Sequence, residues 1–336
     1  MIVEAKVAWL ESPRNLTLRT EELIGPGDGE ILCATIVSAI SPGTEIAAWS
    51  GLPPLRPQVT YPRLQGYCNV SRVLEVGKAV TDMAPGDRIL SFASHRSHML
   101  LRRDEVLFKL DPEANADLIA CTYLFHLGYN SILRSNVRPG NRVLIIGMGA
   151  LGLTTVAVAN LAGAEVYAVT DQDHPAKLAI EMGAKEILRR PSASMFGKES
   201  GDSGGADIVV ITTNSWEDWR LAMGAAAMFG TVACLGFPGR GEPLPSFNPL
   251  DSSFFYMKQL KLEAVGMSAE RNDGRGFLRF NERDNLNWLA RKISDGTLKA
   301  ASLISGRFEG SDLAKAYVNL EIRAGSPITY LLDWNQ

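Results

Sequence analysis

The sequence predicts an α/β protein with a β-rich first part and a doubly wound parallel sheet in its second part. Three observations support this fold class. Short alternating apolar runs fill residues 3–109, three glycines follow an apolar strand at 142–152, and strands then alternate with helices as far as residue 266. Such alternation is typical of a parallel sheet with helices on both faces.

The first part consists of short runs separated by glycine and proline turns such as 26–29 and 85–87. We expect strands at 3–9, 15–19, 30–38, 69–76, 88–92 and 98–101. Many short strands at this spacing are typical of a compact β-barrel rather than a parallel sheet. Helical spacing of apolar residues then predicts a helical stretch between 111 and 134.

The second part repeats strand and helix. We expect strands at 142–146, 165–170, 183–188, 206–211, 231–236 and 260–266, with helices at 153–163, 175–182 and 216–228. The last 70 residues are mixed, with helices at 284–294 and 311–320 and a strand at 328–332, and we expect them to pack on the first part.

Composition excludes several functions. With 34 basic and 37 acidic residues the formal charge is −3, so neither nucleic acid nor an anionic membrane is an expected partner, and the substrate should be a small molecule. No 18 apolar residues run uninterrupted, and the start lacks a signal-peptide core, so we expect a cytoplasmic protein. The four cysteines are scattered and contain no C-x-x-C pair.

The three glycines have the spacing G-x-G-x-x-G between a strand and a helix. Gly147 permits the turn, Gly149 lets main-chain N–H groups approach a pyrophosphate, and Gly152 allows helix and strand to pack closely. Ala150 and Leu151 lie between the second and third glycines, just before the expected helix, whose N-terminus favours an anion. These five residues are therefore candidates for binding a dinucleotide; a tight turn in another kind of parallel sheet is the alternative.

Asp171 ends the next strand, 19 residues after Gly152. A carboxylate at this place accepts hydrogen bonds from the ribose hydroxyls of NAD and repels the additional phosphate of NADP. The expected cofactor is therefore NAD, with NADP less favoured.

A barrel, a Rossmann unit and a return segment in this order resemble the medium-chain dehydrogenase/reductase superfamily, whose first domain is a GroES-like barrel. The resemblance implies a GroES-like catalytic domain at 1–122, a Rossmann domain at 123–266 and a return segment at 267–336. It is carried by the residues at 86–88, 137–140, 147–152, 303–304 and 316–317. The stretches 38–45, 61–62, 66–67 and 76–77 are similar to the branch that contains bacteriochlorophyllide dehydrogenase.

The zinc ligands of this superfamily are missing by alignment. Their three places hold Ser41, Tyr67 and Tyr123, none of which is a usual zinc ligand. The resemblance therefore implies a zinc-free member. A replacement metal site formed by Cys68 with His95 or His98 is an alternative that the spacing does not favour.

Without a Lewis acid, side chains must handle the proton. The candidates, in order, are Tyr67, Thr44, Tyr123 and His126. Tyr67 and Tyr123 stand where metal ligands faced the substrate, and Thr44 aligns with the relay hydroxyl. Either tyrosine could instead fill the vacated metal volume, and His126 could be a core histidine. Glu45 is expected to anchor its loop through backbone or arginine contacts rather than to act as a base.

Two pairs of arginines could bind a carboxylate or phosphate on the substrate, or could simply be solvated: Arg56 with Arg63, and Arg271 with Arg275. The predicted function is an NAD(H)-linked, zinc-independent oxidoreductase for a small polar alcohol/carbonyl pair. The alternatives are NADPH-dependent reduction of an activated double bond, as in quinone and enoyl reductases, or a non-catalytic nucleotide-binding relative. By resemblance we expect a homodimer.

Overall fold

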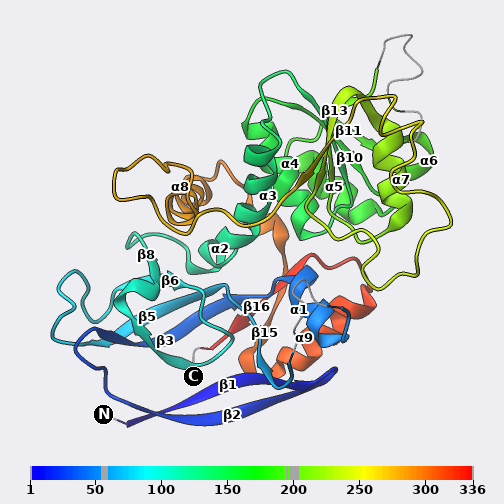
Figure 1. Ribbon diagram of the computed structural model, residues 1–336. Coiled ribbons are helices and arrows are strands. Elements are labelled where there is room, and N and C mark those ends of the chain that lie inside the picture. The colour runs from blue at the N-terminus through cyan, green and yellow to red at the C-terminus, as the bar shows by residue number, and fades with distance from the viewer. Residues whose placement is uncertain (1, 54–59, 194–195, 197–203, 335–336) are drawn as a thin grey trace. The chain divides into compact units, whose positions relative to one another are not determined.

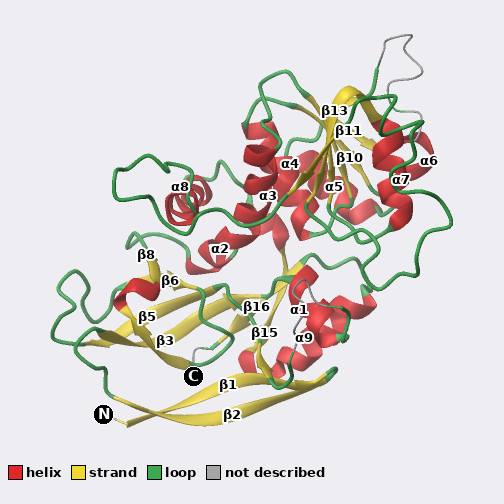
Figure 2. Ribbon diagram, viewed as in Figure 1, coloured by secondary structure: helices red, strands yellow, loops and turns green. Residues whose placement is uncertain are grey.

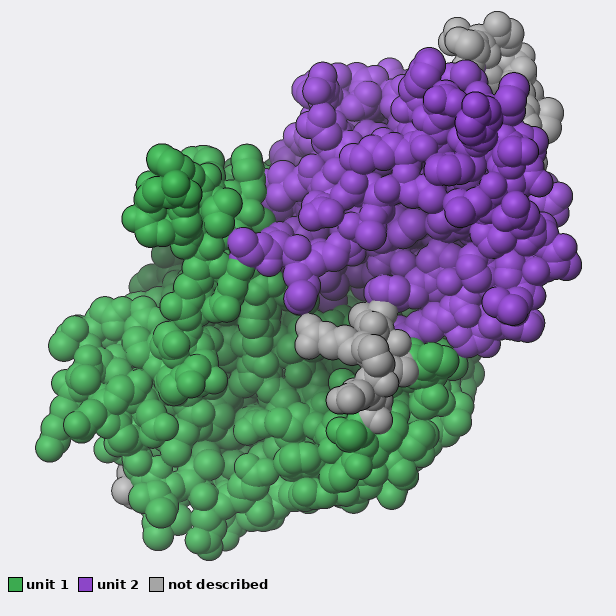
Figure 3. Space-filling view, in the orientation of Figure 1, with its two compact units in different colours: residues 1–123, 270–336 green, residues 124–269 purple. Residues whose placement is uncertain are grey.

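The computed structural model describes residues 2–53, 60–193, 196 and 204–334. The chain divides into two compact units, shown in Figure 3: unit 1 is Met1–Tyr123 with Glu270–Gln336, and unit 2 is Leu124–Ala269. The boundaries expected from the sequence, after residues 122 and 266, lie one and three residues before these.

Unit 1 contains two sheets, labelled in Figure 1. One has the order β2-β1-β4 and the other β15-β16-β3-β5-β6-β8, with β7 also paired to β3. All of these pairs are antiparallel except β15 with β16. The strands are β1 (Ile2–Ser12), β2 (Asn15–Ile24), β3 (Glu30–Ala39), β4 (Arg63–Leu64), β5 (Asn69–Val76), β6 (Arg88–Ser91), β7 (His98–Arg102), β8 (Val106–Lys109), β15 (Ile304–Glu309) and β16 (Thr329–Asp333).

The helices of unit 1 are α1 (Pro42–Trp49), α2 (Ala116–Ala120), α8 (Glu282–Ser294) and α9 (Leu313–Ile322). Helix α1 begins with Ser41 as its N-cap and proline in its first turn, a common way to start a helix. Trp49 at its end packs edge to face on Tyr317 of α9, with ring centroids 5.6 Å apart. Residues 41–45, expected to be a loop, therefore form the start of a helix, so that expectation was wrong.

Unit 2 is built on one parallel sheet of order β11-β10-β9-β12-β13-β14. Strands β10, β11 and β13 of this sheet are labelled in Figures 1 and 2. The order reverses between β9 and β12, which is the doubly wound Rossmann arrangement. Its strands are β9 (Arg142–Ile146), β10 (Glu165–Val169), β11 (Glu186–Leu188), β12 (Ala206–Ile211), β13 (Ala226–Cys234) and β14 (Lys261–Ala264). The helices are α3 (Thr122–Arg134), α4 (Ala150–Leu161), α5 (Asp173–Glu181), α6 (Arg190–Ala193) and α7 (Trp216–Ala225), with α3 starting two residues before the unit boundary.

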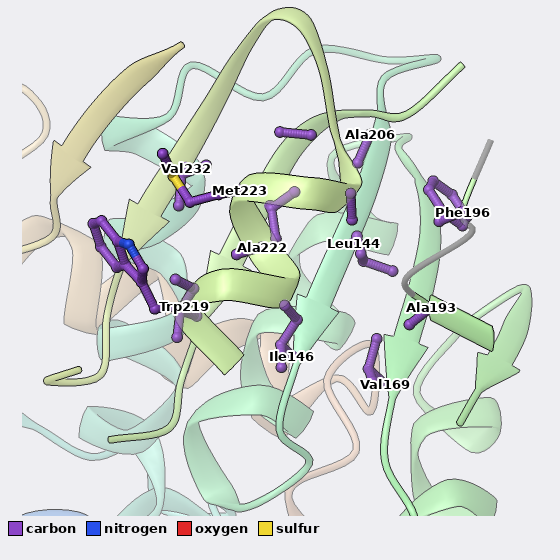
Figure 4. Close-up of a cluster of buried hydrophobic side chains, with 14 of the residues drawn as sticks. Leu144, Ile146, Val169, Ala193, Phe196, Ala206, Trp219, Ala222, Met223 and Val232 are labelled. Atoms are coloured by element: carbon purple, nitrogen blue, oxygen red, sulfur yellow. The ribbon is translucent and has the colours of Figure 1, made fainter. Parts of the chain in front are cut away.

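The core of unit 2 explains why β9 is apolar after its first residue. Residues Val143 to Ile146 are fully buried, because helices cover both faces of a parallel sheet. Figure 4 shows Leu144 and Ile146 in the same cluster as Ala222 and Met223 of α7. This strand holds the glycine turn at its carboxyl end.

The helix expected at 216–228 is shorter in the structure. Helix α7 ends at Ala225, and β13 begins at Ala226, which pairs with Ala206 of β12. A short apolar run such as 225–228 has no periodicity that distinguishes a helix from a buried strand. Elsewhere the predicted fold class, a GroES-like part with a Rossmann sheet, is confirmed. Within the part of the chain that the structure describes, no helix is both long and apolar enough to cross a membrane.

Candidate functional site

The glycine turn begins directly after β9. Gly147 has a φ of +92°, a region that non-glycine residues rarely adopt, and its N–H donates to the carbonyl of Val169 at 3.0 Å. A Cβ atom at this position would overlap the side chain of Thr213. Both the backbone angle and the close approach therefore require glycine here.

Gly149 and Gly152 have different surroundings. A Cβ added to Gly152 would overlap the carbonyl oxygen of Gly147, so α4 lies tightly against the turn. A Cβ added to Gly149, the N-cap of α4, would meet no atom within 4 Å. The space above Gly149 is thus open to a ligand.

The start of α4 offers main-chain donors to that space. Its first hydrogen bond runs from the N–H of Leu153 to the carbonyl of Gly149, at 3.0 Å. The N–H groups before Leu153, those of Ala150, Leu151 and Gly152, belong to the first turn, whose donors have no partner within the helix. Together with the helix dipole they fit the pyrophosphate of a dinucleotide.

Asp171 lies two residues after β10, and Arg190 holds its carboxylate. The main-chain N–H of Arg190 donates to Oδ1 at 3.1 Å, and its Nη1 donates to Oδ2. Arg190 also pairs with buried Asp218 at 2.7 Å. Burial opposes ionisation of Asp171, but the hydrogen bonds and charge of Arg190 outweigh it and lower the pKa of this carboxyl. Asp171 is therefore ionised and half-exposed, and its charge is offset by an arginine.

In unit 1, three hydroxyl groups meet at the start of α1. The phenol of Tyr67 donates to Oγ of Ser41, and Tyr67 also has a hydrogen bond with the side chain of Thr44. We call Ser41, Thr44 and Tyr67 the hydroxyl cluster. Ser41 is the N-cap of α1, yet its side chain makes no capping bond, because its hydroxyl is bonded to Tyr67 instead.

Tyr123 lies beside this cluster. Its ring packs edge to face on Tyr67, with centroids 5.3 Å apart, and on Phe92, with centroids 5.0 Å apart. The three residues that stand at the superfamily's zinc-ligand positions, Ser41, Tyr67 and Tyr123, therefore lie together in unit 1.

Both phenols are held in the protonated form. Burial raises the pKa of Tyr67 well above its usual value, and the nearby Cys68 and Glu45 raise it further, whereas the bonds to Ser41 and Thr44 act in the opposite direction. Burial also raises the pKa of Tyr123. At neutral pH each tyrosine can donate a proton but does not act as a base.

His126 lies on α3 in unit 2, whereas the hydroxyl cluster belongs to unit 1. Its side chain is fully buried, and burial lowers the pKa of its imidazole to about 4. The ring is therefore neutral at pH 7, as in a core histidine.

The side chains at the expected metal position do not fit zinc. Zinc sites in proteins use thiolates, imidazoles and carboxylates, whereas Ser41, Tyr67 and Tyr123 offer hydroxyl groups, two of them bonded to each other. In the described ranges, no three or more histidine, cysteine, aspartate or glutamate residues are grouped so that they could hold a metal ion.

The alternative metal site with Cys68 is also disfavoured. Burial raises the pKa of the Cys68 thiol well above its usual value, which opposes the thiolate that a metal needs. Both ring nitrogens of His95 have other partners, Ser38 at 2.8 Å and Glu45 at 2.8 Å. In His98, Nδ1 is likewise engaged, since it lies 3.1 Å from Oγ of Ser97.

The sequence did not reveal the partners of Glu45. Its carboxylate accepts from the N–H of Ser41, which confirms the expected backbone contact. Its other partners among the described residues are His95 and Tyr317, so none of these is an arginine. Nothing in the local sequence links three positions so far apart. The only available signal was the Ser41-Pro42 pair, which marks a helix start.

The candidate arginines outside the cluster are mostly occupied. Arg271 pairs with Glu270 and Asp104, and Arg275 pairs with Asp273 at 2.9 Å. Arg56 lies outside the described residues. These contacts favour surface ion pairs over a substrate site.

Part of the chain is similar to a known protein family. Residues 150–283 match the family described as zinc-binding dehydrogenase. The match begins inside the glycine turn and does not include Ser41, Tyr67 or Tyr123, so it carries no information about the metal position.

Two relatives in sequence are dehydrogenases. The NADP-dependent isopropanol dehydrogenase of Entamoeba histolytica is 25% identical over 197 residues, covering 58% of this chain and half of that protein's length. The L-galactonate-5-dehydrogenase of Escherichia coli K12 is 24% identical over 338 residues, covering 91% of this chain and 92% of that protein.

The fold is shared over almost the whole chain. A candidate zinc-binding dehydrogenase from Sinorhizobium meliloti 1021, solved with NADP, has a TM-score of 0.80 at 23% identity and covers 98% of this chain and 99% of its own. The comparisons thus confirm the predicted fold, and the matched relatives are dehydrogenases, the class of enzyme predicted for this chain.

Proposed function

We propose that this chain, a relative of the zinc-binding dehydrogenases with the fold of the medium-chain superfamily, is a zinc-independent oxidoreductase acting on a small polar alcohol/carbonyl pair. The observation that carries the proposal is the hydroxyl cluster, in which a protonated phenol, Tyr67, stands where the superfamily has a metal ligand. We also propose that the chain belongs to the zinc-free branch that resembles bacteriochlorophyllide dehydrogenase.

The cofactor would be held mainly by backbone. The N–H groups of Ala150, Leu151 and Gly152 would bind the pyrophosphate, Gly149 would leave room for it, and Asp171 would accept hydrogen bonds from the ribose. Because Asp171 is ionised, we propose NAD as the preferred cofactor. When bound, the nicotinamide supplies or accepts the hydride.

Tyr67 would handle the proton. In the direction of reduction, its O–H bond breaks as a new O–H bond forms on the former carbonyl oxygen, which yields the alcohol. The hydroxyls of Ser41 and Thr44 can then turn to donate to the phenolate until solvent returns the proton. The raised pKa of Tyr67 keeps the phenol protonated at neutral pH, so this residue has a proton to give to a carbonyl oxygen but is not ready to take one from an alcohol.

The direct test is Tyr67→Phe, assayed with NADH and NADPH on a panel of small ketones, aldehydes and polyols. Loss of a general acid should lower kcat by about 10²- to 10⁴-fold, with the Kd of NADH unchanged. Tyr61→Phe is the matched control, since it removes a phenol of unit 1 that donates to the main-chain carbonyl of Ala48 at 2.6 Å. Equal activity of Tyr67→Phe and wild type would refute the assigned role.

Reduction of an activated double bond by NADPH is the second candidate. The observation in its favour is that Arg189 and Arg190 both lie beside the cofactor acid, Arg190 on Asp171 and Arg189 on Asp173, where they could accept a phosphate. In that case enones or quinones would be turned over, and NADPH would bind more tightly than NADH. A chain that binds NADH but reduces nothing on either panel would be the non-catalytic relative.

We also propose a homodimer. Strand β14 is the last strand of the parallel sheet as described, and an edge strand presents main-chain groups that can pair with a second copy. Light scattering at several concentrations would test this, with a monomer at all of them as the contrary result.

A further inference from the structure

Beneath the start of α1 lies a group of buried polar side chains that the proposed reaction does not use directly. Glu45 is 2% exposed, and both His95 and Tyr317 are 0% exposed. They come from α1, the segment between β6 and β7, and α9. Buried charge is costly unless it is fully hydrogen-bonded, so the bonding of Glu45 decides what this group can do.

Glu45 is fully bonded on both carboxylate oxygens. Its Oε1 accepts from the main-chain N–H of Ser41 at 2.7 Å. Its Oε2 lies 2.8 Å from Nε2 of His95 and accepts from the phenol of Tyr317 at 2.6 Å. With three donors directed at it, Glu45 has the arrangement expected of a buried carboxylate.

The ring of His95 is held on both sides. The indole of Trp334 donates to Oγ of Ser38 at 2.9 Å, and this oxygen lies 2.8 Å from Nδ1 of His95. The other ring nitrogen, Nε2, lies 2.8 Å from Oε2 of Glu45. His95 is therefore fixed between Ser38 and Glu45.

The same carboxylate determines how α1 begins. An N-cap serine normally uses its hydroxyl to bind an N–H of the first turn. Ser41 does not: its side chain makes no capping bond, Glu45 takes its main-chain N–H, and its hydroxyl is bonded to Tyr67. The orientation of the Ser41 hydroxyl is thus tied to Glu45 through one main-chain bond.

We propose that Glu45, fixed by His95 and Tyr317, is a positioning residue that aims the Ser41 hydroxyl at the phenol of Tyr67. This inference rests on the proposed function, because it assigns Glu45 a part in orienting the proton donor. The alternative is that the buried group only anchors α1 to α9 and the barrel, in which case weakening it would lower stability without changing Tyr67.

Two variants separate these possibilities. Tyr317→Phe removes one donor to Glu45 and keeps the ring that packs on Trp49. Glu45→Gln replaces the carboxylate by an amide that cannot accept all three bonds. Ser71→Ala is the matched control, since it also removes a fully buried hydroxyl of unit 1, one that donates to Asn69 at 2.5 Å.

The first readout does not require turnover. Full-length protein labelled with [¹³Cζ]tyrosine gives a resonance for Tyr67, assigned by its absence from Tyr67→Phe. A positioning role predicts that the chemical shift of Tyr67 changes in Tyr317→Phe and Glu45→Gln but not in Ser71→Ala. The chemical shift of Tyr167, which lies in unit 2, should be unchanged in all three variants. An unmoved Tyr67 resonance in folded Tyr317→Phe overturns the proposal, whether or not Glu45→Gln folds.

The second readout is kinetic. This readout applies if the Tyr67 resonance moves and the wild type reduces a substrate of the panel. We then expect kcat to fall about 10-fold in Tyr317→Phe and about 100-fold in Glu45→Gln, because a catalytic group is misplaced. The KM for NADH should be unchanged in both variants. Unchanged kcat in both variants would overturn the proposal. A moved resonance with no turnover by the wild type on any panel supports the positioning role and instead counts against the proposed function.

Discussion

The glycine turn of unit 2 and the hydroxyl cluster of unit 1 are built in opposite ways. In the turn, the groups that would bind the ligand are main-chain N–H groups, and glycine is needed because it has no side chain. Gly152 lies against the carbonyl oxygen of Gly147, and Gly149 leaves open space for the ligand. In the cluster, the chemistry lies in the hydroxyls of Ser41, Thr44 and Tyr67, and their orientation depends on distant partners.

This difference determines how each region should respond to mutation. A site made of backbone has little tolerance for an added atom, because a carbonyl oxygen cannot move without moving the chain. A site made of side chains should tolerate the loss of a neighbouring hydroxyl more gradually, unless that hydroxyl is the reacting group. The predictions below test this contrast, beginning with the largest expected effect.

Gly152→Ala should damage both the fold and cofactor binding. Its Cβ would overlap the carbonyl oxygen of Gly147, so α4 must shift away from the turn. We expect a loss of about 3 kcal/mol or more in the free energy of unfolding, as for severe overpacking, and loss of detectable NADH binding. Urea unfolding and NADH fluorescence titration would measure these effects.

Gly149→Ala is the informative contrast, since its Cβ meets no protein atom within 4 Å. Unfolding should be unchanged while the Kd of NADH rises about tenfold or more, because the methyl group occupies space intended for the ligand. Gly224→Ala, on α7 with equally open surroundings, is the control for both. If Gly149→Ala and Gly224→Ala bind NADH equally well, the pyrophosphate does not lie above the turn.

His126 should make stability depend on pH. The unfolded imidazole takes a proton below pH 6.5, but the folded one takes it only near pH 4, so the unfolded state gains protons first as the pH falls. The free energy of unfolding should therefore drop by up to about 3 kcal/mol between pH 6.5 and 4 on account of this residue. Urea unfolding at several pH values would show it.

His126→Gln should flatten that decline, whereas His174→Gln on α5 should leave it as in wild type. The same decline in all three proteins would mean that other groups cause it. A flattened profile together with normal turnover would identify His126 as a core residue of unit 2 and remove it from the candidates for proton transfer.

The same contrast explains what the sequence could predict. The glycine turn was predictable because a G-x-G-x-x-G pattern between a strand and a helix is local. Close contacts require Gly147 and Gly152, whereas Gly149 leaves open space. The apolar run 143–146 likewise indicated a buried strand of a parallel sheet. The prediction failed at the short apolar run around Ala226, where local periodicity does not distinguish helix from strand, and at residues 41–45, where the expected loop is the start of α1.

The buried partners of the cluster could not be predicted in this way. The grouping of Ser41, Tyr67 and Tyr123 was suggested by resemblance to the superfamily rather than by spacing. Glu45, His95 and Tyr317 are 50 or more residues apart from one another, and they meet only because α9 and the segment between β6 and β7 both pack against α1. A carboxylate in an apolar stretch indicates a partner but does not identify it.

Asp171 should control the choice between the two dinucleotides. Asp171→Asn removes the charge that opposes a 2′-phosphate and frees Arg190 from its ion pair. NADPH should therefore bind more tightly and NADH less tightly. We expect the ratio of their Kd values to shift about tenfold, or 1.4 kcal/mol. Fluorescence titration with both cofactors would measure the ratio. Asp173→Asn, which removes a neighbouring and largely exposed acid, should leave it within twofold. No shift in Asp171→Asn would mean that this carboxylate serves only to hold Arg190.

Tyr123→Phe should have the smallest effect, because the contact that joins Tyr123 to the cluster is made by its ring. The edge-to-face contacts with Tyr67 and Phe92 do not require the phenolic oxygen, and the hydrogen bonds of Tyr67 go to Ser41 and Thr44. We expect kcat to change by less than about threefold, or 0.6 kcal/mol, against the loss of at least 100-fold expected for Tyr67→Phe. Tyr123→Ala, which removes the ring, should be worse than Tyr123→Phe. If Tyr123→Phe instead lost as much activity as Tyr67→Phe, the proton would have to pass through both phenols.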